Sequence, residues 1–254
     1  MNLLRVATYN IHSCIGGDRS YDPPRILKVL REIDADILAL QEVGGYPVDG
    51  QEQVHYFERH LGMTLIPGLN LRRRRVQFGN ALLVRGQVEI AEQVNLTVSR
   101  LEPRSAIDAT VETRLGSLRV IATHLGLLPR DRRRQIAIIS TLLDRGMAPL
   151  TLLMGDFNVF GPERAVLHQI GAPRPLPKLR SFPARRPLMS LDRLWTLPNE
   201  NLSALHLHRT PLSAIASDHL PLVGEMAIPV PQTEARAADK DAELETMTVR
   251  SSVE

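Results

Sequence analysis

The chain repeats one arrangement that limits its fold: a short apolar, β-rich run with a polar residue at or near one end. In chain order, the polar residues at these positions are Asn10, Glu42, His124, Asp156 with Asn158, Asp192, and Asp218 with His219. In layered α/β structures, the strand ends along one edge of a sheet form a ligand crevice. Strands that are far apart in the sequence would therefore bring these polar groups together.

Apolar spacing predicts alternating strands and helices in the first half and a β-rich middle. Asp22 and the prolines after it predict a helix start, because Asp caps free N–H groups and proline has none to lose there. We expect strands at 4–9, 37–40, 80–84, 106–112, 118–123, 150–154, 191–197, 204–208 and 220–228. We expect further helices at 51–61 and 132–145, and loops at 72–75 and 172–187.

The 254 residues are enough to bury the core of one large domain or two small ones. No linker divides residues 1–228, so we expect a single catalytic domain over that range. Residues 229–254 are polar, mixed in charge and without an apolar stripe. We expect this segment to be a disordered tail.

Cellular location is limited by what the chain lacks. No apolar run approaches the roughly 20 residues that span a bilayer, so we expect no transmembrane segment. The first ten residues run into strand-like sequence and do not have the regions of a signal peptide. Cys14 is the single cysteine, which excludes an internal disulfide framework and is compatible with a reducing compartment. We expect a cytoplasmic monomer, and attachment to a membrane surface through a partner stays open.

The basic residues are almost all arginine. Lysine occurs at 3 positions, so 31 basic residues less 3 lysines leaves 28 arginines, and the net charge is +3. The runs Arg72–Arg75 and Arg132–Arg134 are compatible with phosphate binding. They are equally compatible with a coding bias that places solvated arginines on an ordinary surface. Basic runs alone do not identify a substrate.

In residues 152–160, LLMGDFNVF, an apolar run breaks at Gly155 and then presents Asp156 and Asn158. If the strand continues through Asn158, the carboxylate and the amide point to the same face. The alternative is that these residues only build a turn. Each other polar residue also has a structural interpretation: Asn10 in a turn, Glu42 solvated in a loop, His124 in the core, Asp192 paired with Arg193, and Asp218-His219 in a capped loop.

The ordered set TYNIH, ILALQEV, FGNALLV, IATHLG, LMGDFNV, SLDRLW and SDHLPLV resembles the endonuclease/exonuclease/phosphatase superfamily. The match spans roughly residues 4 to 227, and GDFN and SDH after LQEV are the specific motifs. The resemblance implies a four-layer α/β sandwich, with two mixed β-sheets packed face to face and helices on both outer sides. It also implies a phosphodiester or phosphomonoester hydrolase that uses a divalent metal, usually Mg²⁺.

Phosphoester hydrolysis needs charge neutralisation, a positioned water and stabilisation of the departing oxygen. Mg²⁺ prefers oxygen ligands and commonly uses one or two carboxylates. We expect Glu42 to be the main ligand, with Asn10 beside it and Asp218 as a further contributor. Mn²⁺ would be a substitute for Mg²⁺ at this site.

The remaining polar residues suit proton transfer and phosphate contact. We expect Asp156 to position or deprotonate the attacking water and Asn158 to contact the phosphate or hold the carboxylate. The resemblance implies that Asp192 pairs with His219, and water activation is left open between Asp156 and His219. His124 would stabilise transition-state oxyanions or protonate the leaving oxygen. Arg104, in EPRSAI, occupies the position of a phosphate-contacting arginine.

The substrate class is argued from composition. Nucleases often use aromatic platforms, and aromatic residues are only 4% of this chain. His12 stands where several nuclease relatives carry an acidic residue, which departs from their metal site. These features favour a small phosphodiester or a phospholipid head group as substrate. The alternatives are a DNA endo- or exonuclease and an inactive module that binds phosphate.

Overall fold

The computed structural model describes residues 3–73, 76–99, 103–146 and 148–229. Within them, one six-stranded sheet has the order β10-β11-β1-β2-β4-β3, and a five-stranded sheet has the order β5-β6-β7-β8-β9. The strands are β1 (Leu4–Asn10), β2 (Ile37–Gly44), β3 (Thr64–Arg73), β4 (Val76–Val84), β5 (Gln87–Asn95), β6 (Ser105–Thr113), β7 (Gly116–His124), β8 (Thr151–Asp156), β9 (Asp192–Leu197), β10 (Leu202–Leu207) and β11 (Leu222–Met226). The helices are α1 (Pro23–Ile33), α2 (Gln53–Leu61), α3 (Pro129–Asp144) and α4 (Ser213–Ala216), with 3₁₀ turns η1 (His12–Cys14), η2 (Gly161–Ile170) and η3 (Asn199–Asn201).

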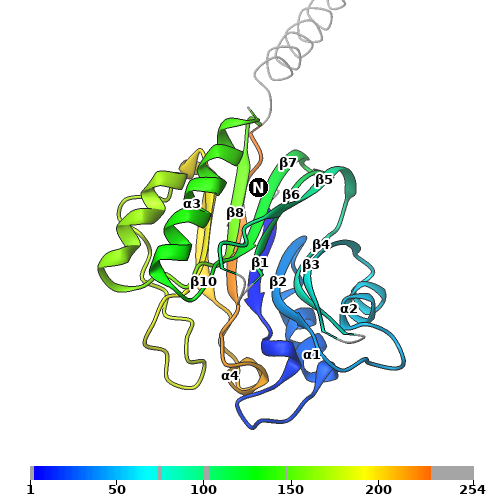
Figure 1. Cartoon of the computed structure of the whole chain (residues 1–254). Coiled ribbons are helices and arrows are strands. Elements are labelled where there is room, and N and C mark those ends of the chain that lie inside the picture. The colour runs from blue at the N-terminus through cyan, green and yellow to red at the C-terminus, as the bar shows by residue number, and fades with distance from the viewer. Residues whose placement is uncertain (1–2, 74–75, 100–102, 147, 230–254) are drawn as a thin grey trace, which may run out of the picture.

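The two sheets pack face to face because their central strands are apolar on both sides. In β2, Ile37 packs into the core between the sheets, and Leu38 packs into the outer core beneath α1 and α2. This alternation is the period of two that a strand imposes on its side chains. In the second sheet, Leu152 faces the central core and Leu153 packs into the outer core with α3 and η2. The four layers are visible in Figure 1, where α3 and the pair α1 and α2 lie on opposite sides. The expected α/β sandwich is confirmed.

Strand direction places the polar strand ends together. β1 pairs with β2 in parallel, and β7 pairs with β8 in parallel, so each pair ends at one edge of its sheet. The register sets His124 opposite Asp156, and Asp156 opposite Asp192 on the antiparallel neighbour β9. Since the two sheets face each other, the ends of all four parallel strands meet at the lower edge in Figure 1.

Local sequence signals account for the helix starts. Asp22 accepts a hydrogen bond from the backbone N–H of Arg25 at 2.9 Å, and Pro23 is the first residue of α1. The predicted cap is therefore present. Among the described residues, no helix is long and apolar enough to cross a membrane.

Two strands were not predicted, and one predicted loop is wrong. β5 is largely exposed along its length, so its sequence has no apolar alternation. β3 contains Pro67 and Gly68, which read as breakers, but β3 is the edge strand where proline is tolerated. The expected loop at 72–75 is contradicted at Arg72 and Arg73, which pair with β4, while 74–75 lie outside the described residues. The predicted tail lies outside them too, apart from Pro229.

Candidate active site

Asn10 joins the two sheets at the edge where their strands end. Its Nδ2 donates to Glu42 Oε1 at 3.0 Å and to Asp156 Oδ2 at 3.1 Å. Its Oδ1 accepts from the backbone N–H of His12, which fixes the orientation of the amide. Asn10 and Asp156 are each 1% exposed, so the inner part of this bridge between the sheets is shielded from water. The strand ends expected to meet do meet here.

Glu42 is presented by an irregularity in β2. The pairing of β2 with β4 shifts register between Leu40 and Val43, and Glu42 has a positive φ of 54°. Bulges of this kind re-aim a side chain, and they are frequent next to active sites. The Glu42 side chain consequently points toward Asn10, and the residue keeps partial exposure to solvent.

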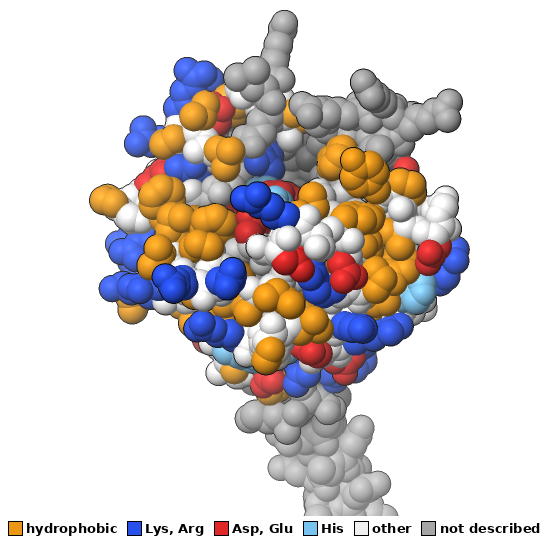
Figure 2. Space-filling model, turned by 90° about the horizontal axis from the view of Figure 1, so that it is seen from below, with side chains coloured by type: hydrophobic (Ala, Val, Ile, Leu, Met, Phe, Trp, Pro, Cys, Tyr) orange, Lys and Arg blue, Asp and Glu red, His pale blue; other side chains and the backbone are white. Residues whose placement is uncertain are grey.

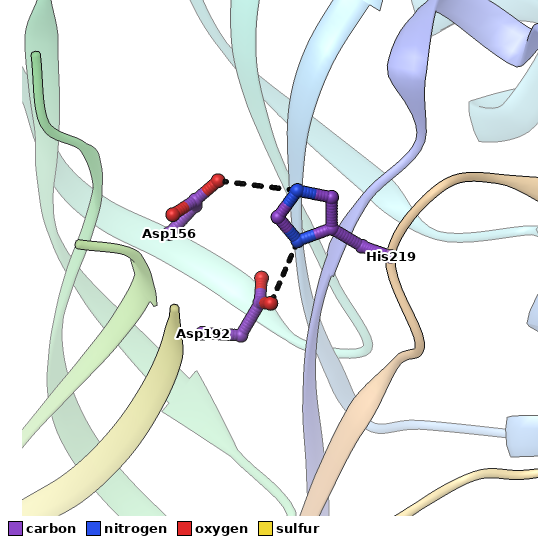
Figure 3. A group of neighbouring side chains, drawn as sticks. All are labelled: Asp156, Asp192 and His219. Atoms are coloured by element: carbon purple, nitrogen blue, oxygen red, sulfur yellow. Dashed lines mark hydrogen bonds and ion pairs between the residues drawn. The ribbon is translucent and has the colours of Figure 1, made fainter. Parts of the chain in front are cut away.

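His219 lies between two carboxylates, as Figure 3 shows. Its Nδ1 is 2.8 Å from Asp192 Oδ2, and its Nε2 is 3.7 Å from Asp156 Oδ2. Ser181 also donates its hydroxyl to Asp192 Oδ2, and the ring of Phe182 packs 4.9 Å from the imidazole, centre to centre. Asp192 and these neighbours hold the ring, so that Nε2 faces Asp156.

Asp156 and Asn158 come together through a turn, and the strand ends at Asp156. Asp156 Oδ1 accepts from the backbone N–H of Asn158 at 2.9 Å, and Asn158 has a left-handed φ of 52°. The strand does not continue through Asn158, so the condition for a common strand face is not met. The alternative, a turn, is present, because a side chain that bonds to the backbone two residues on builds a turn. Gly155, just before the turn, lets β8 approach β7 closely: a Cβ there would lie 1.9 Å from the carbonyl oxygen of Thr123.

His124 receives a hydrogen bond from Arg104 on one side of its ring. Arg104 Nη1 lies 2.8 Å from Nδ1, while Asn158 Nδ2 lies 3.2 Å from Nε2. Both neighbours are donors, and a neutral imidazole has a single acceptor nitrogen. The contact with Arg104 is shorter and charge-assisted, so it takes that acceptor. The proton is thereby assigned to Nε2, which lies 3.6 Å from Asp156 Oδ2; the Asn158 amide then makes no hydrogen bond to Nε2 and donates to the backbone oxygen of Leu125.

Burial and charge shift the pKa values of these groups in different directions. Burial, then the charges of Arg104 and His219, holds the pKa of His124 well below its ordinary value. Burial alone would lower the pKa of His219, but the neighbouring carboxylates, Asp192 first, outweigh it and raise the pKa. Burial, followed by repulsion from Asp192, raises the pKa of Asp156. The two histidines of the site therefore have opposite pKa shifts: the pKa of His124 is lowered and that of His219 is raised.

Asp218 lies at the margin of this group. Its Oδ1 lies 3.3 Å from the hydroxyl oxygen of Ser217 and 3.8 Å from His12 Nδ1. Ser217 donates its one hydroxyl proton to the backbone oxygen of Asn10 at 2.8 Å, which ties the segment just before His219 to β1. The contacts described for Asp218 therefore link it to His12 and Ser217 rather than to Glu42.

Two serines of the site were missed from the sequence. Ser217 belongs to the SDH motif, so its position beside His219 was a signal that could have been used. Ser181 lies in the proline- and arginine-rich stretch that was expected to be a loop, and nothing in that stretch marks it as a partner of Asp192. Ser181 is fully buried.

One group of three potential metal ligands occurs among the described residues. Ligand atoms of Asp156, Asp192 and His219 all lie within 4.8 Å of one another. Both ring nitrogens of His219 are directed at the carboxylates, which is the geometry of a hydrogen-bonded relay. Glu42 and Asn10 form a second candidate position, which supplies mainly oxygen atoms.

Comparisons with known proteins agree with this geometry. Residues 7–219 match the model of the Endonuclease/Exonuclease/phosphatase family. The protein YbhP of Escherichia coli K12 is 28% identical over 245 residues, which cover 87% of this chain and 95% of YbhP. An endonuclease/exonuclease/phosphatase from Beutenbergia cavernae superposes with a TM-score of 0.70 at 23% identity, over 90% of this chain and 72% of that chain. D. rerio TDP2 with a single-strand DNA product gives 0.66 at 15% identity, over 90% of this chain and 100% of that chain.

The resemblance seen in the sequence motifs is thereby confirmed. The family consists of hydrolases that act on phosphoester bonds, typically with a divalent metal. The match includes all the residues of the candidate site, from Asn10 to His219. The chain belongs to the endonuclease/exonuclease/phosphatase family.

Proposed function

We propose that the chain is a phosphodiesterase in which water is activated at Asp156 and His219 and a Mg²⁺-type ion is held at Glu42. One observation carries the proposal. A single carboxylate oxygen, Asp156 Oδ2, is approached by Asn10 at 3.1 Å, His124 at 3.6 Å and His219 at 3.7 Å. Donors from both sheets therefore converge on one buried acceptor, which is where an attacking water would have to be oriented.

The residues at Glu42 fit a hard divalent cation. Glu42 is partly exposed, and the hydrogen bond described for it leaves carboxylate lone pairs for an ion. Mg²⁺ takes oxygen ligands, often one or two carboxylates with waters. Asn10 presents its Nδ2 to Glu42, so it would reach an ion only through Oδ1. Asp218 would contribute from the margin. When bound, the ion would offset negative charge on the phosphoryl oxygens.

The group around His219 suits proton transfer better than metal binding. Asp192 Oδ2 already accepts from Ser181 and from His219 Nδ1, so the imidazole is held with Nε2 toward Asp156. A water between Asp156 and the phosphorus would give its proton to the pair formed by Asp156 and His219. We assign the acceptance of that proton to Asp156, with His219 and Asp192 orienting it and stabilising the charge.

His124 and its neighbours would stabilise the phosphoryl oxygens. Arg104 holds the proton of His124 on Nε2, which faces the site as a neutral donor. A neutral imidazole with a lowered pKa is a hydrogen-bond donor rather than a strong acid. We therefore favour stabilisation of the oxyanion over protonation of the leaving oxygen. Asn158, anchored to the backbone oxygen of Leu125 at 2.9 Å, would keep its amide beside this position.

The substrate we favour is a small phosphodiester or a phospholipid head group. Among the described residues with large exposed apolar side chains, aliphatic residues outnumber aromatic ones, which suits lipid better than stacked bases. A nuclease is the second candidate, because a structure of similar fold, TDP2, was determined with a single-strand DNA product. An inactive phosphate-binding module is the third, and any metal-dependent turnover excludes it.

A substrate panel tests this function. The wild type, with and without a chelator, would be assayed on bis(p-nitrophenyl) phosphate, glycerophospholipids, sphingomyelin, inositol phosphates, plasmid and single-stranded DNA, RNA and an abasic duplex. We expect turnover of a small or lipid phosphodiester that chelation abolishes and Mg²⁺ restores. Turnover confined to nucleic acid would favour the nuclease function over the proposed one. Equal activity with and without the chelator would contradict the proposed metal dependence.

A further inference from the structure

A second pocket opens beside the start of β9, on the side of the chain formed by η2 and the segment before β9. It has a volume of about 320 Å³, within the range of ligand pockets. Arg193 lines it and follows Asp192 directly, so the two side chains leave β9 on opposite faces. Arg193 pairs with Gly155, the residue before Asp156. The pocket is therefore separate from the active site, but it lies beside the ends of β8 and β9, which carry Asp156 and Asp192.

The pocket is strongly basic. Its lining contains Arg164, Lys178, Arg180 and Arg193, and no acidic residue is among the described residues that line it. Arg193 is 4% exposed and donates from Nη1 to the backbone oxygen of Pro177 at 2.8 Å. Its Nε is buried and has no hydrogen-bond partner among the described residues. The buried guanidinium of Arg193 adds a fixed positive charge to the pocket wall, which favours an anionic ligand.

Exposed apolar side chains border the same pocket. Phe160 is 51% exposed and Leu188 is 69% exposed, and both line it. Leu127 is 63% exposed on the neighbouring loop after β7, which follows His124. Figure 2 views the face that carries the strand ends, and on its left side hydrophobic and basic side chains lie next to one another. Binding to a membrane surface uses both kinds of side chain: apolar groups enter the acyl boundary, and basic groups attract anionic lipids.

We propose that this pocket binds the phosphate of an anionic phospholipid and docks the chain on a bilayer with its active site facing the lipid. The proposal builds on the phosphodiesterase function, because it identifies the substrate class as lipid at a membrane surface. Arg193 and its neighbours take the phosphate, and Phe160 and Leu188 enter the acyl boundary. Single-stranded nucleic acid fits less well, because one aromatic residue, Phe160, lines the pocket for base stacking.

Vesicle binding tests the proposal without requiring catalysis. The full chain would be sedimented with vesicles of phosphatidylcholine alone and of phosphatidylcholine with phosphatidylglycerol, and a single-stranded oligonucleotide would be titrated in parallel. Arg164→Ala/Arg180→Ala removes two charges, and Phe160→Ser/Leu188→Ser removes the apolar border. Arg133→Ala/Arg134→Ala, on the exposed face of α3, removes the same charge elsewhere. Thermal midpoints establish that each variant is folded.

We expect binding to the anionic vesicles only. It should fall about thirtyfold in Arg164→Ala/Arg180→Ala, since each basic residue near an anionic surface contributes a factor of about five. It should also fall in the Phe160→Ser/Leu188→Ser variant but stay within about twofold in the α3 control. No vesicle binding, an equal loss in the α3 control, or oligonucleotide binding that depends on Arg164 and Arg180 would each overturn the proposal. Because turnover is not measured, these results are independent of whether the active site hydrolyses phosphodiesters.

Discussion

Arg104 donates to Nδ1 of His124 across 2.8 Å, from the loop before β6 to the end of β7. This contact fixes the tautomer of His124. It also adds to burial in holding the pKa of the imidazole down. The positive charge of Arg104 therefore prepares a neutral donor at the site.

Removing that charge should change the state of His124 in a measurable way. In the wild type, ¹⁵N NMR of labelled imidazoles should give His124 as the Nε2–H tautomer and neutral at pH 6. In Arg104→Met the pKa should rise, but it should stay below its ordinary value because burial, the larger cause, remains. Arg114→Met removes an exposed arginine at the far end of the β6–β7 hairpin and should leave His124 unchanged. A protonated His124 in the wild type at pH 6 would contradict the assignment.

The metal proposal predicts that ion affinity resides in Glu42. We would measure Mn²⁺ binding by calorimetry on chelator-treated protein. The affinity should weaken by at least about tenfold in Glu42→Gln, because mutating even a residue that only contacts a metal ligand typically costs that much in metal affinity. Asp49→Asn removes an exposed carboxylate from the connection between β2 and α2 and should bind as the wild type does. Equal Mn²⁺ affinities in the two variants, or no Mn²⁺ binding by the wild type, would contradict the assignment of the ion to Glu42.

Cys14 should be inert in the folded protein. It is 0% exposed, and burial, followed by the charge of Asp22, raises the pKa of its thiol. The thiolate is the reactive form, so neither access nor ionisation favours modification. A thiol reagent such as dithionitrobenzoate should react only after denaturation in guanidinium. Ser117→Cys adds an exposed thiol and should react at once, and comparable reaction of native wild type would show that Cys14 is accessible.

The sequence predicted what depends on apolar pattern and missed what depends on contacts across the fold. The cap at Asp22 and the buried strands of both sheets follow from local signals. β5 could not be predicted, because its side chains are largely exposed and its place is set by pairing with β6. β3 was missed for a similar reason. Pro67 argues against a strand in the sequence, but proline is tolerated at the edge of a sheet, and no local pattern shows that β3 is an edge strand.

The site shows the same division. The residues at the strand ends could be named from the sequence, and Asn10, Asp156 and His219 lie together. Their orientations could not be named, because they depend on partners from other segments. Ser181 reaches Asp192 from a stretch without periodicity. The turn at Asn158 depends on a backbone conformation that the expected strand does not have.

The central claim is that Asp156 and His219 act as one unit on a phosphodiester, and a double-mutant cycle tests it most directly. Turnover of bis(p-nitrophenyl) phosphate would be measured for wild type, Asp156→Asn, His219→Ala and the double variant, with thermal midpoints for each. The control is Asp36→Asn, which changes a partly buried carboxylate at the start of β2, far along the strand from Glu42. Contaminating hydrolase is excluded by purifying all variants identically.

Each single variant should lose at least ~10²-fold in turnover, the lower end for losing an acid–base group. The double variant should lose far less than the product of the two, because groups that act as a unit are non-additive. Asp36→Asn should keep its turnover even if its thermal midpoint falls. Turnover near the wild-type value in folded Asp156→Asn, or losses that multiply in the double variant, would contradict the account.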